Sequence, residues 1–325
     1  MLVLTESDLR AVLTMGDVIH AVGQGFRALG SGEVQVPERL RLDIPASRGV
    51  VLEMPACGVV DGARALGTKI VSVFERNAQR GLEIVQAVYL LLDSDTGVPL
   101  ALMDGRFITA IRTAAASAVA TKYMSPQGSK RLAVFGAGVQ AEFHIDAMIE
   151  IADIERVVIA SRAADKARAL ADRVEATRDM PCELVSAEEA ATANLICTCT
   201  SSGVPVFDGR LLNAGTHINA VGAFTPSTRE LDTDTVRRAR VIIDAESAAG
   251  REAGEILIPI AEGSIDVSHV KGTLTEVVSG KIRGRESDSD ITLFKSCGLA
   301  IEDLVTAQLA YSKASERGIG TRIDM

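Results

Sequence analysis

A glycine-rich turn lies in the middle of the chain, where residues 131–141 read RLAVFGAGVQA. An apolar run comes before the glycines, and the residues after them can open a helix. In such a unit Gly136 allows the tight turn, and Gly138 lets backbone amides approach a pyrophosphate at the positive end of the helix. Ala141 is small enough for helix and strand to pack closely. The turn predicts a dinucleotide-binding site, with a nucleotide-free α/β turn as the alternative.

The end of the next expected strand indicates which dinucleotide binds. Residues 157–162 read VVIASR, and no acidic side chain follows until Asp165. An acid at this point would suit the ribose hydroxyls of NADH. Ser161 and Arg162 suit a 2′-phosphate instead, because a guanidinium can pair with phosphate through two hydrogen bonds. We therefore expect NADPH. The alternative is a solvated Arg162 beside the adenine, which leaves NADH acceptable.

Cations stand among apolar residues in the first half of the chain: Arg41 in RLRLDIP, Lys69 in LGTKIVSV and Arg112 in TAIRTAAASA. An unpaired buried charge is costly, so each needs a partner, and that partner can be a ligand. We expect Arg41 and Arg112 to bind a substrate carboxylate, with Lys69 as a proton donor or carboxylate contact. The alternative is that they are edge-strand and helix-surface cations. We expect structural roles for the histidines, which are His20, His144, His217 and His269.

The order of the expected elements indicates an α/β protein with a second, sheet-containing domain. Helix-capping signals mark two short helices within residues 5–30, and short β-rich runs with turns over 38–104 indicate an antiparallel sheet. An alanine-dense helix is expected over 106–124. Beyond Gly128, strands of about five residues alternate with helices, which is typical of a doubly wound parallel sheet. Residues 297–317 return to a helix period.

Composition excludes several classes of protein. The 325 residues suffice for two domains, and a hydrophobic content of 47% can fill a core in each. A net charge of −9 argues against nucleic acid and anionic membranes as partners. We expect no signal peptide and no membrane span, because no basic region followed by a long apolar stretch opens the sequence and no segment has the roughly 18 apolar residues that a span needs. Five scattered cysteines indicate a reduced, cytoplasmic protein, and we expect no metal site.

A set of motifs follows in order between about residues 37 and 310: MP-A, GTK-IV, MDG-x-x-x-T-A-x-RTAAASA-x-AT, GAGVQA, H-INAVGA-x-x-P-x-x-REL-D and FKS-x-G-x-A-x-ED. In this combination they resemble the ornithine cyclodeaminase/mu-crystallin family. The resemblance implies a homodimer in which a Rossmann domain, residues 117–299, is inserted into a substrate-binding and dimerisation domain. That second, α+β domain comprises residues 1–116 plus 300–325. The resemblance also implies that Arg41, Lys69 and Arg112 hold the substrate carboxylate and imine.

The resemblance further implies a set of cofactor contacts. Ser161 and Arg162 would lie at the adenosine ribose, where the mu-crystallin branch similarly has a non-acidic residue followed by arginine, which fits NADPH. Val221 and the Lys295-Ser296 pair would approach the nicotinamide. The remaining contacts would be Thr113 beside the pyrophosphate, Ala137, Gly138, Val139 and Gln140 in the glycine turn, and Thr200 and Ser201 after a later strand.

Two departures from the family pattern limit which of the family's reactions we expect. Ornithine cyclodeaminases and the related alanine dehydrogenase carry an acid/base aspartate two residues before the proline of GA-x-x-P, where this chain has Phe224. The glutamate for the distal amine of ornithine has no match, because Glu53 is displaced by one residue and a strand would turn it to the other face. We therefore expect reduction of pyrroline-2-carboxylate or piperideine-2-carboxylate to L-proline or L-pipecolate, with Phe224 as an apolar wall.

Two other functions stay open. The scaffold can use bound NAD in an ornithine cyclodeaminase, or in an amino-acid dehydratase or dehydrogenase of the same family. A protein of mu-crystallin type can bind NADPH and a small ligand such as thyroid hormone without catalysis. The presence of Arg41, Lys69 and Arg112 together favours an enzyme over a binding protein.

Overall fold

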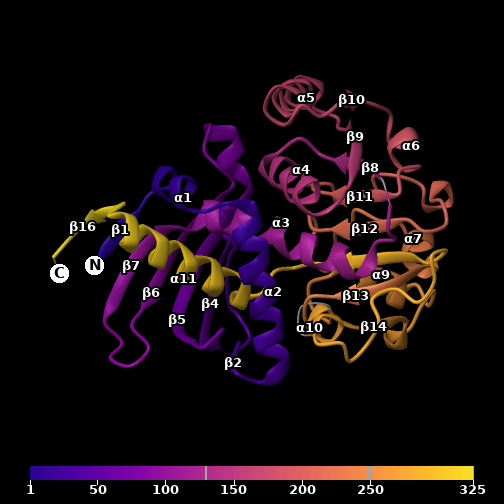
Figure 1. The fold of residues 1–325 in the computed structure, drawn as a ribbon. Helices are drawn as coiled ribbons and strands as arrows, with labels where there is room; N and C mark the ends of the chain where they lie inside the picture. The colour runs from indigo at the N-terminus through magenta and orange to yellow at the C-terminus, as the bar shows by residue number, and fades with distance from the viewer. Residues whose placement is uncertain (129, 247–249, 325) are drawn as a thin grey trace. The chain divides into compact units, whose positions relative to one another are not determined.

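The computed structural model describes residues 1–128, 130–246 and 250–324. The chain divides into two compact units. Unit 1 comprises Met1–Arg112 and Leu299–Met325, and unit 2 comprises Thr113–Gly298. The chain enters unit 2 inside helix α3 (Gly105–Met124) and leaves it just before helix α11 (Ala300–Arg317) (Figure 1).

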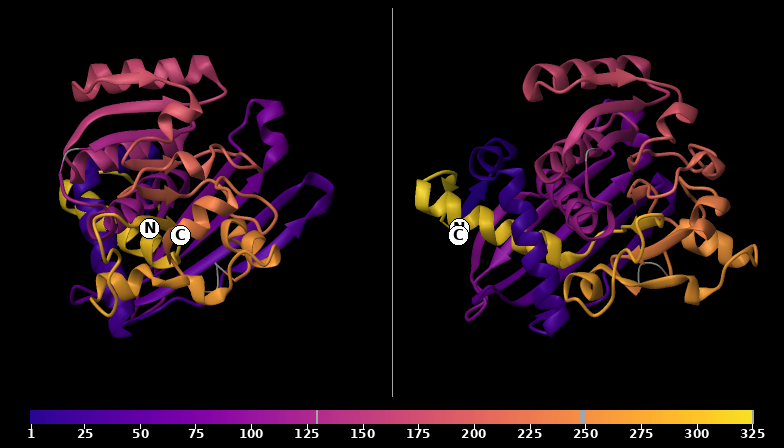
Figure 2. Two further views of the ribbon diagram at one scale, coloured as in Figure 1. Left: turned by 90° about the vertical axis from the view of Figure 1, so that its right-hand side faces the viewer. Right: turned by 45° about the vertical axis from the view of Figure 1, so that its right-hand side comes forward.

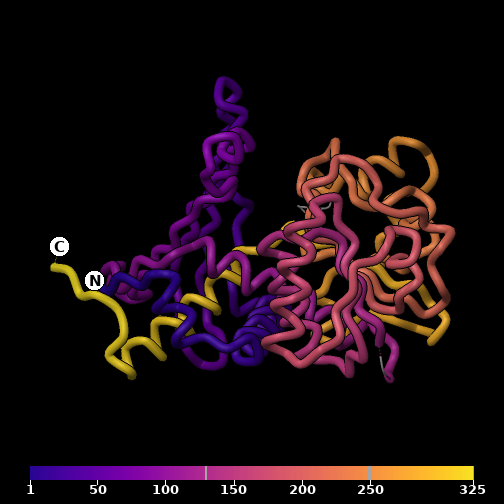
Figure 3. The backbone as a smooth tube through the Cα atoms, turned by 90° about the horizontal axis from the view of Figure 1, so that it is seen from above, coloured from indigo at the N-terminus to yellow at the C-terminus, as the bar shows by residue number. Residues whose placement is uncertain are grey.

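Unit 1 is built on a mixed sheet in the order β16-β1-β7-β6-β5-β4-β2, with β3 paired to β4. Its strands are β1 (Leu2–Leu4), β2 (Val34–Gln35), β3 (Leu40–Ile44), β4 (Gly49–Val60), β5 (Ala63–Phe74), β6 (Val85–Leu92), β7 (Pro99–Asp104) and β16 (Thr321–Arg322). Strands β3 to β7 pair antiparallel, as the short β-rich runs separated by turns predict. The ends of β3 to β6 that carry the short helices η1 (Pro45–Ser47) and η2 (Glu75–Arg80) extend as an arm of this sheet (Figure 3).

The two faces of this sheet have different surroundings. Helix α11 packs against β4, β5 and β6 on one face (Figure 1). That face carries the buried cross-strand row Met54, Lys69, Tyr89 and Met103. The opposite face carries the exposed row Leu40, Glu53, Ile70 and Val88. The strand period of two therefore separates Lys69 from its neighbour Ile70 by the full thickness of the sheet.

The helices of unit 1 begin where the sequence predicts. Helices α1 (Glu6–Val12) and α2 (Met15–Ser31) are capped by Thr5 and Thr14, whose side chains accept from the backbone of the third helical residue. Helix α2 packs closely on α11, because a Cβ at Gly25 would lie 3.1 Å from Ile301 and from Val305.

Unit 2 has a sheet in the order β10-β9-β8-β11-β12-β15-β13-β14 whose pairs are all parallel. Its strands are β8 (Lys130–Phe135), β9 (Ile154–Ala160), β10 (Cys182–Leu184), β11 (Leu195–Thr198), β12 (His217–Ala220), β13 (Ala239–Ile243), β14 (Val270–Thr273) and β15 (Ile291–Lys295). Besides the second part of α3, the helices in its described residues are α4 (Val139–Ile151), α5 (Ala164–Arg178), α6 (Ala187–Ala190), α7 (Thr233–Arg238), α9 (Gly254–Ala261) and α10 (Leu274–Val278), with short helices η3 (Gly209–Leu211) and η4 (Val267–His269). The predicted doubly wound parallel sheet is confirmed (Figure 2).

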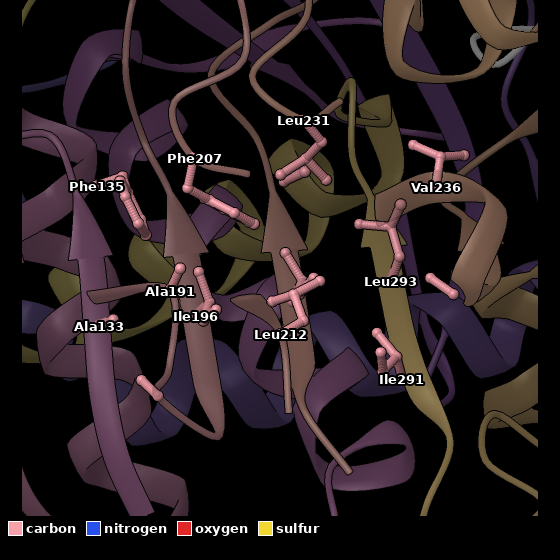
Figure 4. Close-up of a cluster of buried hydrophobic side chains, with 14 of the residues drawn as sticks. Ala133, Phe135, Ala191, Ile196, Phe207, Leu212, Leu231, Val236, Ile291 and Leu293 are labelled. Atoms are coloured by element: carbon pink, nitrogen blue, oxygen red, sulfur yellow. The ribbon is translucent and has the colours of Figure 1, made fainter. Parts of the chain in front are cut away.

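One apolar cluster covers a single face of the unit 2 sheet. Phe135 on β8, Ile196 on β11 and Leu293 on β15 project from one face of the sheet toward Phe207 and Leu231 in the connecting segments (Figure 4). The Phe135 and Phe207 ring centroids lie 5.0 Å apart in a tilted arrangement, which is favourable for aromatic pairs. The cluster anchors the carboxyl ends of the strands, where ligands bind in open parallel sheets.

Two histidines belong to the interior of unit 2. His144 contacts Ser117 through Nε2 at 2.9 Å, and His217 contacts Thr292 through Nδ1 at 2.9 Å. Burial lowers the pKa of His144 to about 4 and the pKa of His217 to about 3. Both rings are therefore neutral in the folded protein near pH 7. Within the described ranges, no helix combines the length and the apolar character that crossing a bilayer requires.

We expect the free energy of unfolding to decrease as the pH falls from 6.5 toward 4. In that window the unfolded chain takes up protons on His144 and His217, whereas the folded protein keeps both rings neutral. Urea unfolding at several pH values measures this slope, and His144→Asn should reduce it. The exposed His20 is the control. An equal reduction on His20→Asn would contradict this explanation.

Candidate active site

The glycine turn has the shape that a pyrophosphate requires. Gly136 has a φ of +110°, and a Cβ there would lie 2.6 Å from the carbonyl oxygen of Cys199. Gly138 is the N-cap of α4, and a Cβ on it would meet open space. In the described part of the chain, no side chain caps this helix. Because a helix N-terminus with open space in front of it favours an anion, these residues fit the phosphates of a dinucleotide.

Ser161 and Arg162 follow β9 directly, beside this turn. Phe135 pairs with Ala160 at the ends of β8 and β9, and Gly136 donates its backbone N–H to the carbonyl of Ala160 at 2.9 Å. The Ser161 hydroxyl accepts from the backbone N–H of Ala163 at 3.2 Å, and Arg162 is exposed. Both predicted ribose contacts are thus at the strand end nearest the glycine turn.

A buried carboxylate that sequence analysis did not single out organises the next two strand ends. Glu230 accepts from the Thr198 hydroxyl at 2.8 Å, from both the backbone and hydroxyl of Thr200 at 2.7 Å, and from the backbone of Gly222 at 2.7 Å. It therefore fixes the segments after β11 and β12, which contain the predicted contacts Thr200, Ser201 and Val221. Burial raises the pKa of Glu230, and the charge of Lys295 opposes this effect.

Lys295 is held inside unit 2 by Glu255, which also contacts Glu230. Its Nζ lies 3.2 Å from Oε2 of Glu255 and donates to the carbonyls of Ala220 and Ala223. Glu255 in turn accepts from the backbone N–H of Glu230 at 2.9 Å. Lys295 thereby ties the end of β15 to the segment after β12, which includes the half-buried Phe224.

Ser296 is buried and bonded to a residue that sequence reasoning missed. Its hydroxyl donates to Oδ2 of Asp244 at 3.1 Å, and the backbone N–H groups of Cys297 and Gly298 donate to the same oxygen. Asp244 follows β13 and so fixes the last residues of unit 2. Nothing in the spacing of Asp244 distinguishes it from an ordinary acid after a strand.

Unit 1 contains a buried group of four charged side chains, which we call the charge quartet: Lys69, Arg112, Glu302 and Asp303. Lys69 Nζ lies 2.8 and 2.7 Å from the two carboxylate oxygens of Asp303. Arg112 donates to Asp303 at 3.0 Å and to Glu302 at 2.7 Å. All four side chains are at most 6% exposed. The two predicted cations come together, and their partners in the protein are carboxylates of α11.

Local sequence explains how Lys69 reaches this position. Gly67 leaves space for the ring of Tyr89, since a Cβ there would lie 2.5 Å from the phenol oxygen. Lys69 is two residues further along β5, on the same face and opposite Tyr89. Burial, together with the charge of Arg112, lowers the pKa of Lys69 to about 8, and Asp303 opposes this change.

Arg41 has a different environment from the quartet. It pairs with the exposed Asp43 at 2.8 Å, and 40% of its side chain is exposed. Its cross-strand partner is Leu52, two residues from the Met54 that faces Lys69, so Arg41 lies on the Lys69 face of the sheet. Thr113 follows Arg112 in α3 and is buried. Among the described residues, no metal-binding group of three or more histidine, cysteine or acidic side chains occurs.

Comparison with known proteins identifies the family. The model of the ornithine cyclodeaminase/mu-crystallin family matches residues 1–318. The chain is 36% identical to a Delta(1)-pyrroline-2-carboxylate reductase of Bacillus cereus, over 100% of both chains. It is 38% identical to the rat ketimine reductase mu-crystallin, over 95% of both.

Solved structures agree with this assignment. Thermococcus litoralis Delta(1)-pyrroline-2-carboxylate reductase, in complex with NADH and L-proline, is 41% identical with a TM-score of 0.96, over 99% of this chain and 100% of that one. An archaeal alanine dehydrogenase dimer with bound NAD is 33% identical with a TM-score of 0.94, over 100% of this chain and 99% of that one. This chain belongs to the ornithine cyclodeaminase/mu-crystallin family.

Proposed function

We propose that this chain reduces cyclic ketimines with NAD(P)H, converting pyrroline-2-carboxylate or piperideine-2-carboxylate to L-proline or L-pipecolate. The observation that carries the proposal is the buried Lys69 and Arg112, next to each other, in a chain with Phe224 at the acid/base position. Full-length similarity to pyrroline-2-carboxylate reductases and a ketimine reductase supports it. Unit 1 is the proposed substrate-binding and dimerisation domain, and unit 2 the proposed dinucleotide-binding domain.

The residues have distinct proposed roles. The dinucleotide supplies a hydride when it is bound. Arg112 and Arg41 bind the substrate carboxylate, since guanidinium groups form charge-assisted hydrogen bonds with it. Lys69 donates a proton from Nζ to the imine nitrogen, and its pKa of about 8 keeps it largely protonated at pH 7. Phe224 and Val221 form an apolar wall that excludes water beside the ring.

A cyclodeaminase reaction has less support from the site. Phe224 cannot carry a proton, and Glu53 is exposed on the sheet face opposite Lys69. Similarity to a probable ornithine cyclodeaminase of Bordetella pertussis, at 27% identity, is lower than similarity to the reductases. Ammonia released from ornithine without added cofactor would favour this second function.

We expect purified protein to oxidise NADPH or NADH in the presence of pyrroline-2-carboxylate, followed at 340 nm. Lys69→Ala should lower kcat at least about 100-fold, because a positioned general acid contributes about that factor. In the unsubstituted protein, kcat for reduction should fall above about pH 8, where Lys69 loses its proton. Cofactor binding, measured by fluorescence titration, is the control for folding. Turnover no greater than that of Lys69→Ala would refute the proposal.

The cofactor preference is a separate proposal. Ser161 and the exposed Arg162 favour NADPH, because the guanidinium can bind a 2′-phosphate. Arg162→Ala should raise KM for NADPH about tenfold and leave KM for NADH nearly unchanged, since one charge-assisted contact contributes about 1.5 kcal/mol or more. Arg168→Ala, an exposed arginine on α5, is the matched control. Equal changes for both cofactors would contradict a 2′-phosphate contact.

We propose a homodimer formed through the exposed sheet face of unit 1. Leu40, Leu42, Ile70 and Val88 are 43% to 58% exposed on that face, and exposed apolar patches mark interaction surfaces. A dimer of the related archaeal alanine dehydrogenase supports a second copy as the partner.

A Leu42→Glu, Ile70→Glu double substitution tests this surface. It should shift the protein from dimer to monomer in light scattering at micromolar concentration, because a contact between the copies would bury the new charges. Val267→Glu on η4, where the valine is 76% exposed, is the control and should leave the mass unchanged. A double variant that remains dimeric would show that the interface does not lie on this sheet face.

A further inference from the structure

Asp303 is the carboxylate that Lys69 and Arg112 share. Both of its oxygens contact Lys69 Nζ, and Oδ1 also accepts from Arg112 Nε. Glu302 has a different set of contacts, accepting from Arg112 and from the backbone N–H of Leu299 at 3.0 Å. The two neighbouring acids of α11 therefore differ in their contacts. Asp303 contacts both cations, whereas Glu302 contacts Arg112 and a backbone amide.

We infer that Asp303 is a positioning residue for proton transfer, which orients the Lys69 ammonium toward the imine and keeps it charged until the imine nitrogen takes the proton. This inference rests on the proposed ketimine reduction. Sequence reasoning assigned no role to Asp303.

Donor geometry supports this role. An ammonium has three N–H donors and no acceptor. Oδ1 and Oδ2 of Asp303, at 2.8 and 2.7 Å, lie on one side of Nζ, so this contact fixes the rotation of the ammonium about the Cε–Nζ bond. The N–H groups that do not point at Asp303 then have set directions and one can point at a ligand, whereas the flexible stem of an unpaired lysine would leave the donor in many rotamers. Asp303 itself is held by Arg112, so its oxygens do not depend on Lys69 alone.

Charge is conserved in the proposed transfer. The quartet has two cations and two carboxylates, so its net charge is zero before transfer. Lys69 gives one proton to the imine nitrogen and becomes a neutral amine, so the quartet carries one negative charge beside the positive iminium. A bound reduced dinucleotide would supply the hydride for the imine carbon and would itself be oxidised, so that the C=N double bond becomes a single bond and the product is a secondary amine. Lys69 then recovers a proton from water.

The pKa of Lys69 depends on the groups around it. These are Arg112 on α3, Glu302 and Asp303 on α11, and Tyr89 on β6. Burial and Arg112 lower the pKa of Lys69 to about 8, and Asp303 and Glu302 raise it. The direct contact with Asp303 makes it the stronger of the two acids in this respect. Loss of its charge should therefore lower the pKa of Lys69 further.

Asp303→Asn and Glu302→Gln form a matched pair of test variants. In Asp303→Asn the fall of kcat with rising pH should begin at lower pH, kcat at pH 8 should decrease about tenfold, and KM for the imine should change less than about threefold. Glu302→Gln should shift the pH profile less than Asp303→Asn does, because Glu302 has no direct contact with Lys69, and it should act on KM through Arg112. Asp303→Glu should restore part of the pH profile. Circular dichroism and cofactor titration check that each variant folds.

A second measurement does not depend on activity. Nitrogen NMR of labelled lysine should report a Lys69 pKa near 8 in the unsubstituted protein and a lower value in Asp303→Asn. If the protein reduces no imine, ketimine reduction fails, while this titration still decides whether Asp303 controls Lys69. A Lys69 pKa and a pH profile unchanged in Asp303→Asn, or moved equally by Glu302→Gln, would overturn the inference.

Discussion

The structure of unit 1 depends on the pairing of two buried cations with two buried acids from the other end of the sequence. Lys69 and Asp303 are separated by 234 positions, yet neither side chain is more than 1% exposed. Removing one member of such a group would leave an uncompensated charge in the interior, which is strongly destabilising. The last helix therefore has to return to the first sheet, and this requirement accounts for a unit assembled from two separate segments of chain.

Unit 2 uses the same principle for a different purpose. Glu230, Glu255 and Lys295 are buried together at the carboxyl ends of the parallel strands. Their partners are mainly backbone groups and hydroxyls of the segments that follow β11 and β12. In unit 1 the charges contact each other within the proposed substrate site, whereas in unit 2 they fix the backbone of the segments proposed to contact the cofactor. In unit 2 the buried charges therefore hold backbone segments in position.

Local patterns predicted the fold well, because turn chemistry and periodicity act over a few residues. The Thr5 and Thr14 caps and the strand–glycine–helix unit at Gly136 each follow from adjacent residue types. The parallel sheet followed in the same way from the alternation of strands and helices. These features need no information about distant contacts.

Partners across long separations could not be predicted in the same way. The cost of burying a charge pointed to Lys69 and Arg112, but it did not identify Asp303 and Glu302 as their partners in the protein. The role of Glu230 could not be predicted from the motif that contains it, because its four hydrogen-bond donors come from residues 8 to 32 positions away. Arg41 lies on the Lys69 face of the sheet but differs from the quartet in its exposure and in its pairing with Asp43, which its apolar sequence neighbours do not indicate.

The return of α11 to the first sheet also sets an order of events during synthesis on the ribosome. Unit 2 is one continuous stretch, Thr113–Gly298, so all its strands have been made before α11 exists. Strands β1 to β7 and Arg112 of α3 are translated before unit 2 is complete, yet Lys69 and Arg112 do not meet Glu302 and Asp303 until α11 has been made. Domains generally fold as units while the chain grows. Unit 2 can therefore fold first, whereas the first strands of unit 1 complete their packing only after α11 has been made.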